Sequence, residues 1–188
     1  MRRQWILAAG VTLVALALCA PPAAAKSGLQ DALLERMAGT WVLKGTIAGK
    51  PTTHDVTAEW VLSHEYLRLH EVSREKDAGG RPAYEAIVFI GWDQPSDRYA
   101  CLWLDSTGGG GLNGQAIGYA KRGGDSIAFL FKGSDGSLFH TTFLYDRKVD
   151  AWEWRMDAEE DGKLQPFARV TLARRLREGR MKGTDQKG

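Results

Sequence analysis

The amino-acid sequence predicts an all-β protein: an antiparallel up-and-down β-barrel of about ten strands with a short helix at its N-terminal side. Ten apolar or alternating runs follow one another, separated by turns rich in Gly, Pro and Asp. No helical pattern lies between the runs, which excludes a parallel α/β sheet. A long series of neighbouring antiparallel strands favours closure into a barrel, because closure removes the exposed edges.

The first 25 residues have the pattern of an export signal. Arg2 and Arg3 precede an apolar stretch at 5–18, and the alanines at 23–25 supply a small-residue cleavage site. We expect cleavage after Ala25 and a periplasmic or secreted protein, because no later stretch is long and apolar enough to span a membrane.

Two other export readings rest on the same segment. The arginine pair weakly resembles a twin-arginine signal, although the general secretory route fits better because the residue usual before the pair is absent. Cys19 is in the place of a lipoprotein cysteine, but the preceding residue should be small and is Leu18. After cleavage Cys101 is the single cysteine, so no internal disulfide is expected, and a packed strand cysteine fits its pattern better than a nucleophile.

The charge of the chain is unevenly placed. Residues 1–25 hold two of the 25 basic residues and none of the 23 acidic ones, so the remainder is formally neutral. Residues 174–188 hold six basic and two acidic residues, which leaves 17 basic and 21 acidic residues in 26–173. This argues against a nucleic-acid-binding domain, which would concentrate basic charge on its folded face. The sequence predicts one barrel domain over 26–174 and a basic, fraying tail over 175–188.

The helix is predicted at 29–37. Ser27 and Gln30 have the spacing of a capping box, and apolar residues then recur at helical spacing up to Met37. The strands are predicted at 40–48, 54–62, 65–74, 84–92, 98–105, 114–121, 125–132, 137–145, 150–158 and 165–174.

Alternation assigns the faces of most strands, with three exceptions. The runs 84–92 and 125–132 are apolar on both faces, so a second packed surface or a homodimer interface is expected outside the barrel. In the third run either Tyr66, Arg68 and His70 or the intervening leucines face inward, and alternation leaves both assignments open.

Gly39-Thr40-Trp41 opens the first strand and resembles the Gly-x-Trp motif of lipocalin-like (calycin) barrels, which include fatty-acid-binding proteins and nitrobindins. The resemblance implies that Trp41 plugs the narrow end of the barrel. It also implies that an arginine of the last strand, Arg169 or Arg174, stacks on that tryptophan.

A narrower resemblance covers residues 33–174. Gly91-Trp92-Asp93 and Trp103-Leu104-Asp105-Ser106-x-Gly108 are similar to motifs of a family of exported bacterial barrels that has no assigned activity. The resemblance implies structural places for Asp93 and Asp105 at strand ends. The sequence departs from that family at 63–65, where Ser-His-Glu replaces a small, Gly-rich segment.

The chain carries no recognised catalytic or metal-binding motif. Gly-x-Ser-x-Gly, His-Glu-x-x-His and Cys-x-x-Cys do not occur, and the acidic turn at 157–161 lacks the spacing of a calcium loop. Histidines occur at 54, 64, 70 and 140, and His54 lies on the apolar face of its strand. Similarity to nitrobindins makes His140 the candidate haem ligand, but it lies in no matching motif, so no cofactor is predicted.

The tryptophans are the main indication of a ligand. Six of the seven follow residue 25, and aromatic side chains suit a pocket for apolar molecules. The candidate lumen residues are Trp60, Arg68, His70, Trp103, His140 and Trp154.

We expect an exported barrel that binds a small hydrophobic or amphipathic molecule without transforming it. If Arg68 and His70 face inward, they suit an anionic head group. The alternatives are a structural or partner-binding envelope protein that acts as an oligomer, and a haem protein or enzyme whose residues come from separate strands.

Overall fold

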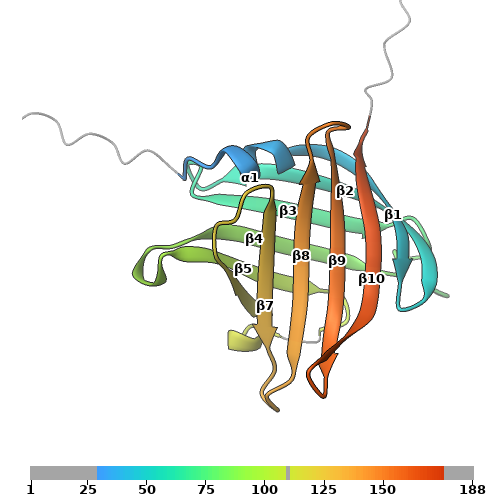
Figure 1. The fold of residues 1–188 in the computed structure, drawn as a ribbon. Coiled ribbons are helices and arrows are strands. Elements are labelled where there is room, and N and C mark those ends of the chain that lie inside the picture. The colour runs from blue at the N-terminus through green and yellow to red at the C-terminus, as the bar shows by residue number, and fades with distance from the viewer. Residues whose placement is uncertain (1–28, 109–110, 176–188) are drawn as a thin grey trace, which may run out of the picture.

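A computed structural model describes residues 29–108 and 111–175, which form one β-sheet closed into a barrel (Figure 1). Two short 3₁₀ turns, Gln94–Ser96 and Gly114–Ala116, lie in the connections. The main elements are α1 (Ala32–Met37), β1 (Gly39–Ile47), β2 (Lys50–Val61), β3 (Tyr66–Ser73), β4 (Glu85–Asp93), β5 (Arg98–Asp105), β6 (Ile117–Ala120), β7 (Ser126–Lys132), β8 (Leu138–Asp146), β9 (Ala151–Glu160) and β10 (Lys163–Arg174).

The topology confirms the predicted ten-stranded antiparallel up-and-down barrel with a short helix. Each strand pairs with its neighbours in sequence, and β1 closes the sheet by pairing with β10 as well as with β2. All ten predicted strands are present, with ends that differ from the prediction by a few residues, as is usual where pairing frays. The predicted signal segment, Ser27, and the tail beyond residue 175 lie outside the described residues.

The helix begins later than predicted. Its N-cap is Asp31, whose Oδ1 accepts hydrogen bonds of 3.0 Å from the backbone N–H groups of both Leu33 and Leu34. The expected capping box at Ser27 and Gln30 is therefore wrong, and α1 covers 32–37 instead of 29–37. Asp31 is held in place from the barrel, because its Oδ2 accepts a hydrogen bond of 2.5 Å from the Tyr99 hydroxyl of β5.

The helix closes one end of the barrel (Figure 1). Leu34 and Met37 are fully buried, and the Met37 carbonyl accepts a hydrogen bond of 2.8 Å from Trp41 Nε1. Arg174 lies over the Trp41 ring, 4.2 Å from its centroid, and donates to the Ala38 carbonyl at 3.1 Å. Arg174 is therefore the arginine that stacks on Trp41.

Gly39 leaves the space that this contact needs. A Cβ on this glycine would lie 2.6 Å from Arg174 Nη1, and its φ of +137° is one that side-chain-bearing residues rarely adopt. Arg169, the other arginine considered for the stack, pairs instead with Asp157 of β9. Asp93 lies at a strand end as expected and accepts a hydrogen bond from Ser96 in the turn that follows.

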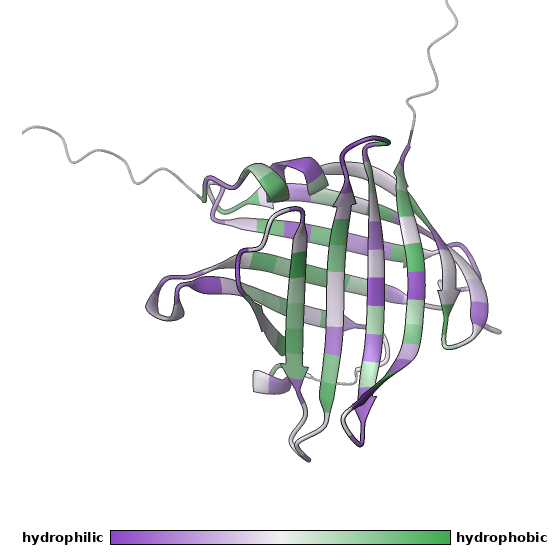
Figure 2. Ribbon diagram, in the orientation of Figure 1, coloured by the Kyte–Doolittle hydropathy of each residue, from purple (hydrophilic) through white to green (hydrophobic). Residues whose placement is uncertain are grey.

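The core fills the half of the barrel next to α1. Large side chains on the inner face are buried, among them Phe129, Phe143, Trp152 and Trp154. Glu153 and Arg155, which alternate with Trp154 along β9, pair with each other outside. The predicted alternation of β9 is thus observed, and Figure 2 shows it as changes of hydropathy along the strands. Burial also raises the pKa of the Cys101 thiol, so this cysteine stays protonated and packed, as expected.

The outer face carries a continuous apolar stripe. It arises because β4 and β7 are apolar on both faces, as predicted, and the strands between them add further apolar side chains. Register pairs these residues across β4–β7 in the order Ile87 with Leu104, Phe89 with Leu102, Leu102 with Ile117, and Tyr119 with Leu130. Ile87 and Leu130 are 37% and 40% exposed. We call these seven residues the outer apolar stripe.

Candidate functional site

A cavity of about 780 Å³ occupies the half of the barrel away from α1. Its size lies within the usual range for small-molecule sites, about 300–1,000 Å³. Exposed Lys50 and Pro51, beside the β1–β2 turn, lie at its mouth. A second hollow of about 440 Å³ lies near Arg98 and Tyr119 and has small or exposed residues around it, so it offers less enclosure.

One wall of the cavity is apolar and largely aromatic. The inward positions of four strands supply Trp103 from β5, Phe131 from β7, Phe139 from β8 and Met156 from β9, and Phe167 of β10 packs on Phe139 with ring centroids 5.5 Å apart. These side chains provide apolar surface from which a ligand can displace water.

Gly118 of β6 makes room for part of this wall. The Phe131 ring lies where a side chain on residue 118 would stand, 2.6 Å from the position of a Cβ. Any larger residue at 118 therefore has to move this ring.

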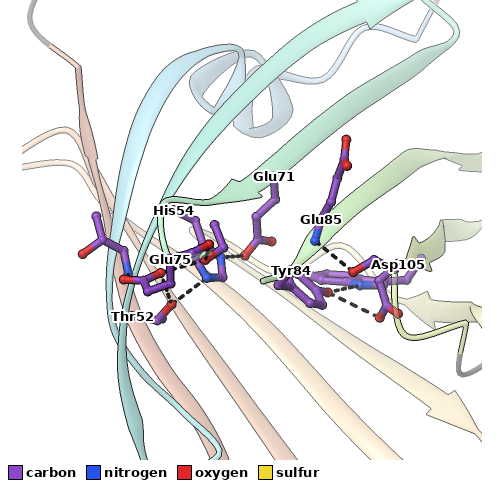
Figure 3. A network of polar contacts seen from close by, with 11 residues as sticks. Thr52, His54, Glu71, Glu75, Tyr84, Glu85 and Asp105 are labelled. Carbon is purple, nitrogen blue, oxygen red and sulfur yellow. Dashed lines mark hydrogen bonds and ion pairs between the residues drawn. The ribbon is translucent and has the colours of Figure 1, made fainter. Parts of the chain in front are cut away.

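The opposite wall is polar and is centred on a buried histidine–glutamate pair. His54 Nδ1 is hydrogen-bonded to Glu71 Oε1 (Figure 3). The two side chains are only 3% and 4% exposed. Register explains the contact: β2 and β3 pair Val56 with Glu71 and His54 with Ser73, which places His54 and Glu71 diagonally on the same inner face.

The pair continues toward the mouth as a chain of hydrogen bonds. His54 Nε2 lies 2.6 Å from Thr52 Oγ1, and this hydroxyl lies 3.2 Å from Glu75 Oε2. Ser73 Oγ also donates to Glu75 Oε2, at 2.7 Å. His54 therefore bonds Glu71 through one ring nitrogen and Thr52 through the other, and Thr52 donates to Glu75.

Glu75 is held in its charged form. The hydrogen bond from the Ser73 hydroxyl, followed by one from its own backbone N–H, lowers the pKa of this carboxyl below its ordinary value. The chain therefore ends in a carboxylate at the mouth of the cavity. It connects this carboxylate with the buried one of Glu71 through Thr52 and His54.

Tyr84 joins the polar wall to the aromatic one. Its ring stacks on His54 with centroids 5.7 Å apart, and its hydroxyl accepts a hydrogen bond of 3.1 Å from Trp103 Nε1. The hydroxyl in turn lies 3.4 Å from Asp105 Oδ2 (Figure 3). Burial, and next the charge of Glu71, raise the pKa of Tyr84, so the phenol keeps its proton.

The three tryptophans expected in the lumen differ in position. Trp103 lines the cavity. Trp154 lies beneath it, edge-on to Trp103 with centroids 6.5 Å apart, and its Nε1–H has no hydrogen-bond partner among the described residues. Trp60 lies outside the cavity lining, at the α1 end of β2, and stacks on His64 with centroids 3.9 Å apart. Asp105, for which a structural place was expected, lines the cavity as well.

The three polar anchors expected from the sequence lie outside the barrel. In β3, Leu67 and Leu69 face inward and are followed on that face by Glu71 and Ser73, so the apolar core takes the leucine set. Arg68 and His70, 41% and 40% exposed, pair with glutamates of the neighbouring strands.

His140 likewise faces outward and pairs with Glu159 of β9 at 2.7 Å. It cannot serve as the lumen ligand of a haem, because its ring is on the other side of the sheet. Among the described residues, His54 is the one histidine that lines the cavity.

Sequence reasoning placed His54 on an apolar face but missed its partners. Glu71, Thr52, Ser73 and Tyr84 look locally like ordinary strand and loop residues. The signal that identifies Glu71 is the β2–β3 register, which becomes readable once the turn at 62–65 is fixed.

A comparison with protein-family models finds no matching family, and a comparison with curated proteins finds no match. In the part of the chain that the structure describes, none of the helices has the length and apolar character needed to cross a bilayer. The same residues contain no group of three or more His, Cys, Asp or Glu side chains placed to hold a metal ion. The site is thus defined by its own geometry: an aromatic cavity with one polar wall.

Proposed function

We propose that this protein is an exported, lipocalin-like binding barrel that holds a small hydrophobic or amphipathic molecule in its lumen without transforming it. The observation that carries the proposal is the cavity of about 780 Å³, open at one end and walled by Trp103, Phe131, Phe139 and Phe167. The export part of the proposal rests on the pattern of residues 1–25, and the family part on the Gly39-x-Trp41 motif.

The closed end supports a binding role. Helix α1 and the tryptophans beneath the cavity fill the barrel on that side, so a ligand has one way in and one aromatic floor to rest on. Each CH₂ group that the ligand buries stabilises the complex by about 0.8 kcal/mol, which favours molecules with an extended apolar part.

Fluorescence titration with N-phenyl-1-naphthylamine, a neutral apolar probe, tests the proposal. We expect saturable binding of one probe per chain, with energy transfer from Trp103. The variant Trp103→Phe should reduce that transfer, whereas Trp60→Phe, which changes a tryptophan outside the cavity lining, should alter it much less. Absence of saturable binding, together with no small molecule retained in native mass spectrometry of the purified protein, would overturn the proposal.

A second candidate function, self-association as an envelope protein, is favoured by the outer apolar stripe. The charged neighbours Arg68 and His70 are already paired within the chain, so the stripe suits the same apolar surface of a second copy. Light scattering on the wild type and on Phe89→Glu is the test, with Thr57→Glu, outside the stripe on β2, as control. A dimer that only Phe89→Glu dissociates supports this candidate, and a monomeric wild type excludes it.

A further inference from the structure

The charges that face the cavity are mostly negative. Glu71, Glu75 and Asp105 belong to its lining, and Lys50, exposed at the rim, is the one lysine or arginine among the described lining residues. Arg68, which could have balanced a negative head group, is outside and engaged by Glu59. The polar wall therefore offers acceptors to a ligand more than it offers positive charge.

Two of these carboxylates have acceptor capacity left over. Glu71 receives a single hydrogen bond among the described residues, from His54 to Oε1, and its Oε2 receives none although the side chain is buried. Asp105 Oδ1 accepts two hydrogen bonds from Thr107, one from its backbone N–H at 2.9 Å and one from its hydroxyl at 2.5 Å, but Oδ2 is approached only by the Tyr84 hydroxyl, at 3.4 Å. A carboxylate can accept about four hydrogen bonds, and burying it with fewer is costly unless a donor arrives.

The rings between these carboxylates also suit a positive charge. Tyr84 keeps its phenolic proton, its ring stacks on His54, and its hydroxyl bonds the Trp103 indole, so the three rings line the cavity as neighbours. Tryptophan and tyrosine faces attract ammonium groups through the ring quadrupole. A cationic donor placed here thus meets acceptors and aromatic faces together.

We propose that the ligand is an amphipathic amine: its protonated amine is bound at the polar wall by Glu71, with Tyr84 and Asp105 beside it, and its apolar body lies on the aromatic wall. This rests on the proposed function and narrows it. An anionic head group is disfavoured because it would be desolvated beside like charges. A neutral hydroxyl can use the same acceptors, but without the strengthening that a charged donor gives a hydrogen bond.

Competition among three ligands that share one alkyl chain tests the inference. Decylamine, decanol and decanoate are each titrated against the bound neutral probe N-phenyl-1-naphthylamine at pH 7, below their micelle-forming concentrations. We expect the amine to bind at least about tenfold more tightly than the alcohol, because only its ammonium adds attraction between opposite charges to the hydrogen bond that either head group can donate to the carboxylate. The carboxylate should bind least.

The outcomes separate this inference from the proposed function. Equal affinity for amine and alcohol, or tightest binding of decanoate, overturns the amine assignment while binding in the lumen stands. Failure of the probe and of all three ligands to bind overturns both. The titration is repeated at 0.5 M salt, where exposed charges are screened and a buried contact is screened much less. A preference for the amine that persists at this salt concentration excludes nonspecific attraction to the protein surface, and a preference that disappears overturns the amine assignment.

Matched variants locate the contact. Glu71→Gln keeps the shape of the side chain and should reduce the preference for amine over alcohol at least about fivefold, since it replaces a charged acceptor by a neutral one. Glu85→Gln is the control, because Glu85 forms the same kind of pair with His70 on the outer face, at 2.7 Å. If Glu71→Gln fails to fold by circular dichroism, Asp105→Asn takes its place. An unchanged preference in the folded cavity variant, or an equal loss in Glu85→Gln, overturns the assignment to this wall.

Discussion

Asp31 is expected to matter for stability more than a cap on a six-residue helix usually does. Its carboxylate satisfies the Leu33 and Leu34 backbone N–H groups through one oxygen and the buried Tyr99 hydroxyl through the other. Removal of an N-cap costs about 1 kcal/mol. A buried hydroxyl left without a partner costs a further 1–3 kcal/mol, roughly. Asp31→Ala should therefore lower the free energy of unfolding by about 2–4 kcal/mol, measured by urea denaturation with tryptophan fluorescence as the signal.

A double-mutant cycle separates the two contributions. In a Tyr99→Phe background no hydroxyl is left unpaired, so Asp31→Ala should cost about 1–3 kcal/mol less than it does in the wild type. Asp31→Asn is the matched control, because its amide oxygen can still cap the helix and its amide nitrogen can donate to the tyrosine hydroxyl. A loss below about 0.5 kcal/mol in Asp31→Ala, or no coupling with Tyr99, would refute the reasoning, because such a value is typical of an ordinary surface change.

Three further predictions concern the cavity, the closed end and pH. Gly118→Ala should displace the Phe131 ring, which lies 2.6 Å from the new Cβ, and weaken probe binding in the same fluorescence titration; unchanged affinity would contradict the packing described. Arg174→Ala should lower the free energy of unfolding by about 2–3 kcal/mol. It removes the cation–π contact with Trp41 and two charged hydrogen bonds to backbone carbonyls, and these contacts are partly exposed to water. Denaturant unfolding measures the change, and a loss below about 1 kcal/mol would contradict this account. The hydrogen bond from Arg174 lowers the pKa of Asp150 below its ordinary 3.8, so the unfolded chain takes up this proton first as pH falls. The stabilisation that the Asp150 carboxylate provides is thus complete well above pH 3.8 and is lost below it. In thermal melting from about pH 7 to 2.5, the melting temperature of Asp150→Asn should approach that of the wild type as pH falls. A difference in melting temperature that stays constant with pH would refute the assignment.

Most of the barrel could be predicted because its signals are local. Turn pairs such as Asp161-Gly162 separate the strands, and alternation in β9 places Trp152 and Trp154 inside. The start of the helix could not be predicted in the same way. A Ser-x-x-Gln spacing and a lone Asp31 are both reasonable caps locally, and what selects Asp31 is Tyr99, 68 positions further along the chain.

The candidate site depended on partners that no local pattern reveals. In β3 one face carries two leucines followed by Glu71 and Ser73, and the other carries Tyr66, Arg68 and His70. Both faces therefore mix apolar and polar residues, and alternation alone does not show which one is buried. The choice is made by burial of the leucines in the core, which takes Arg68 outward and brings Glu71 in beside His54. Trp103 could be proposed from its aromatic inward position, but the same signal selected Trp60 and Trp154, which do not line the cavity.

The pairing of β1 with β10 has a consequence for the kinetics of folding. Arg174 donates to the carbonyl of Ala38, 136 positions away, so closure joins segments from the two ends of the domain. Contacts of such separation carry a large loop-closure entropy and slow the search for the native state. Until β10 is in place, β1 keeps one edge unpaired, which other chains can pair with. A chain that ends at Phe167 keeps every described residue of the cavity lining but lacks the part of β10 that pairs with β1, so it should fold slowly and aggregate.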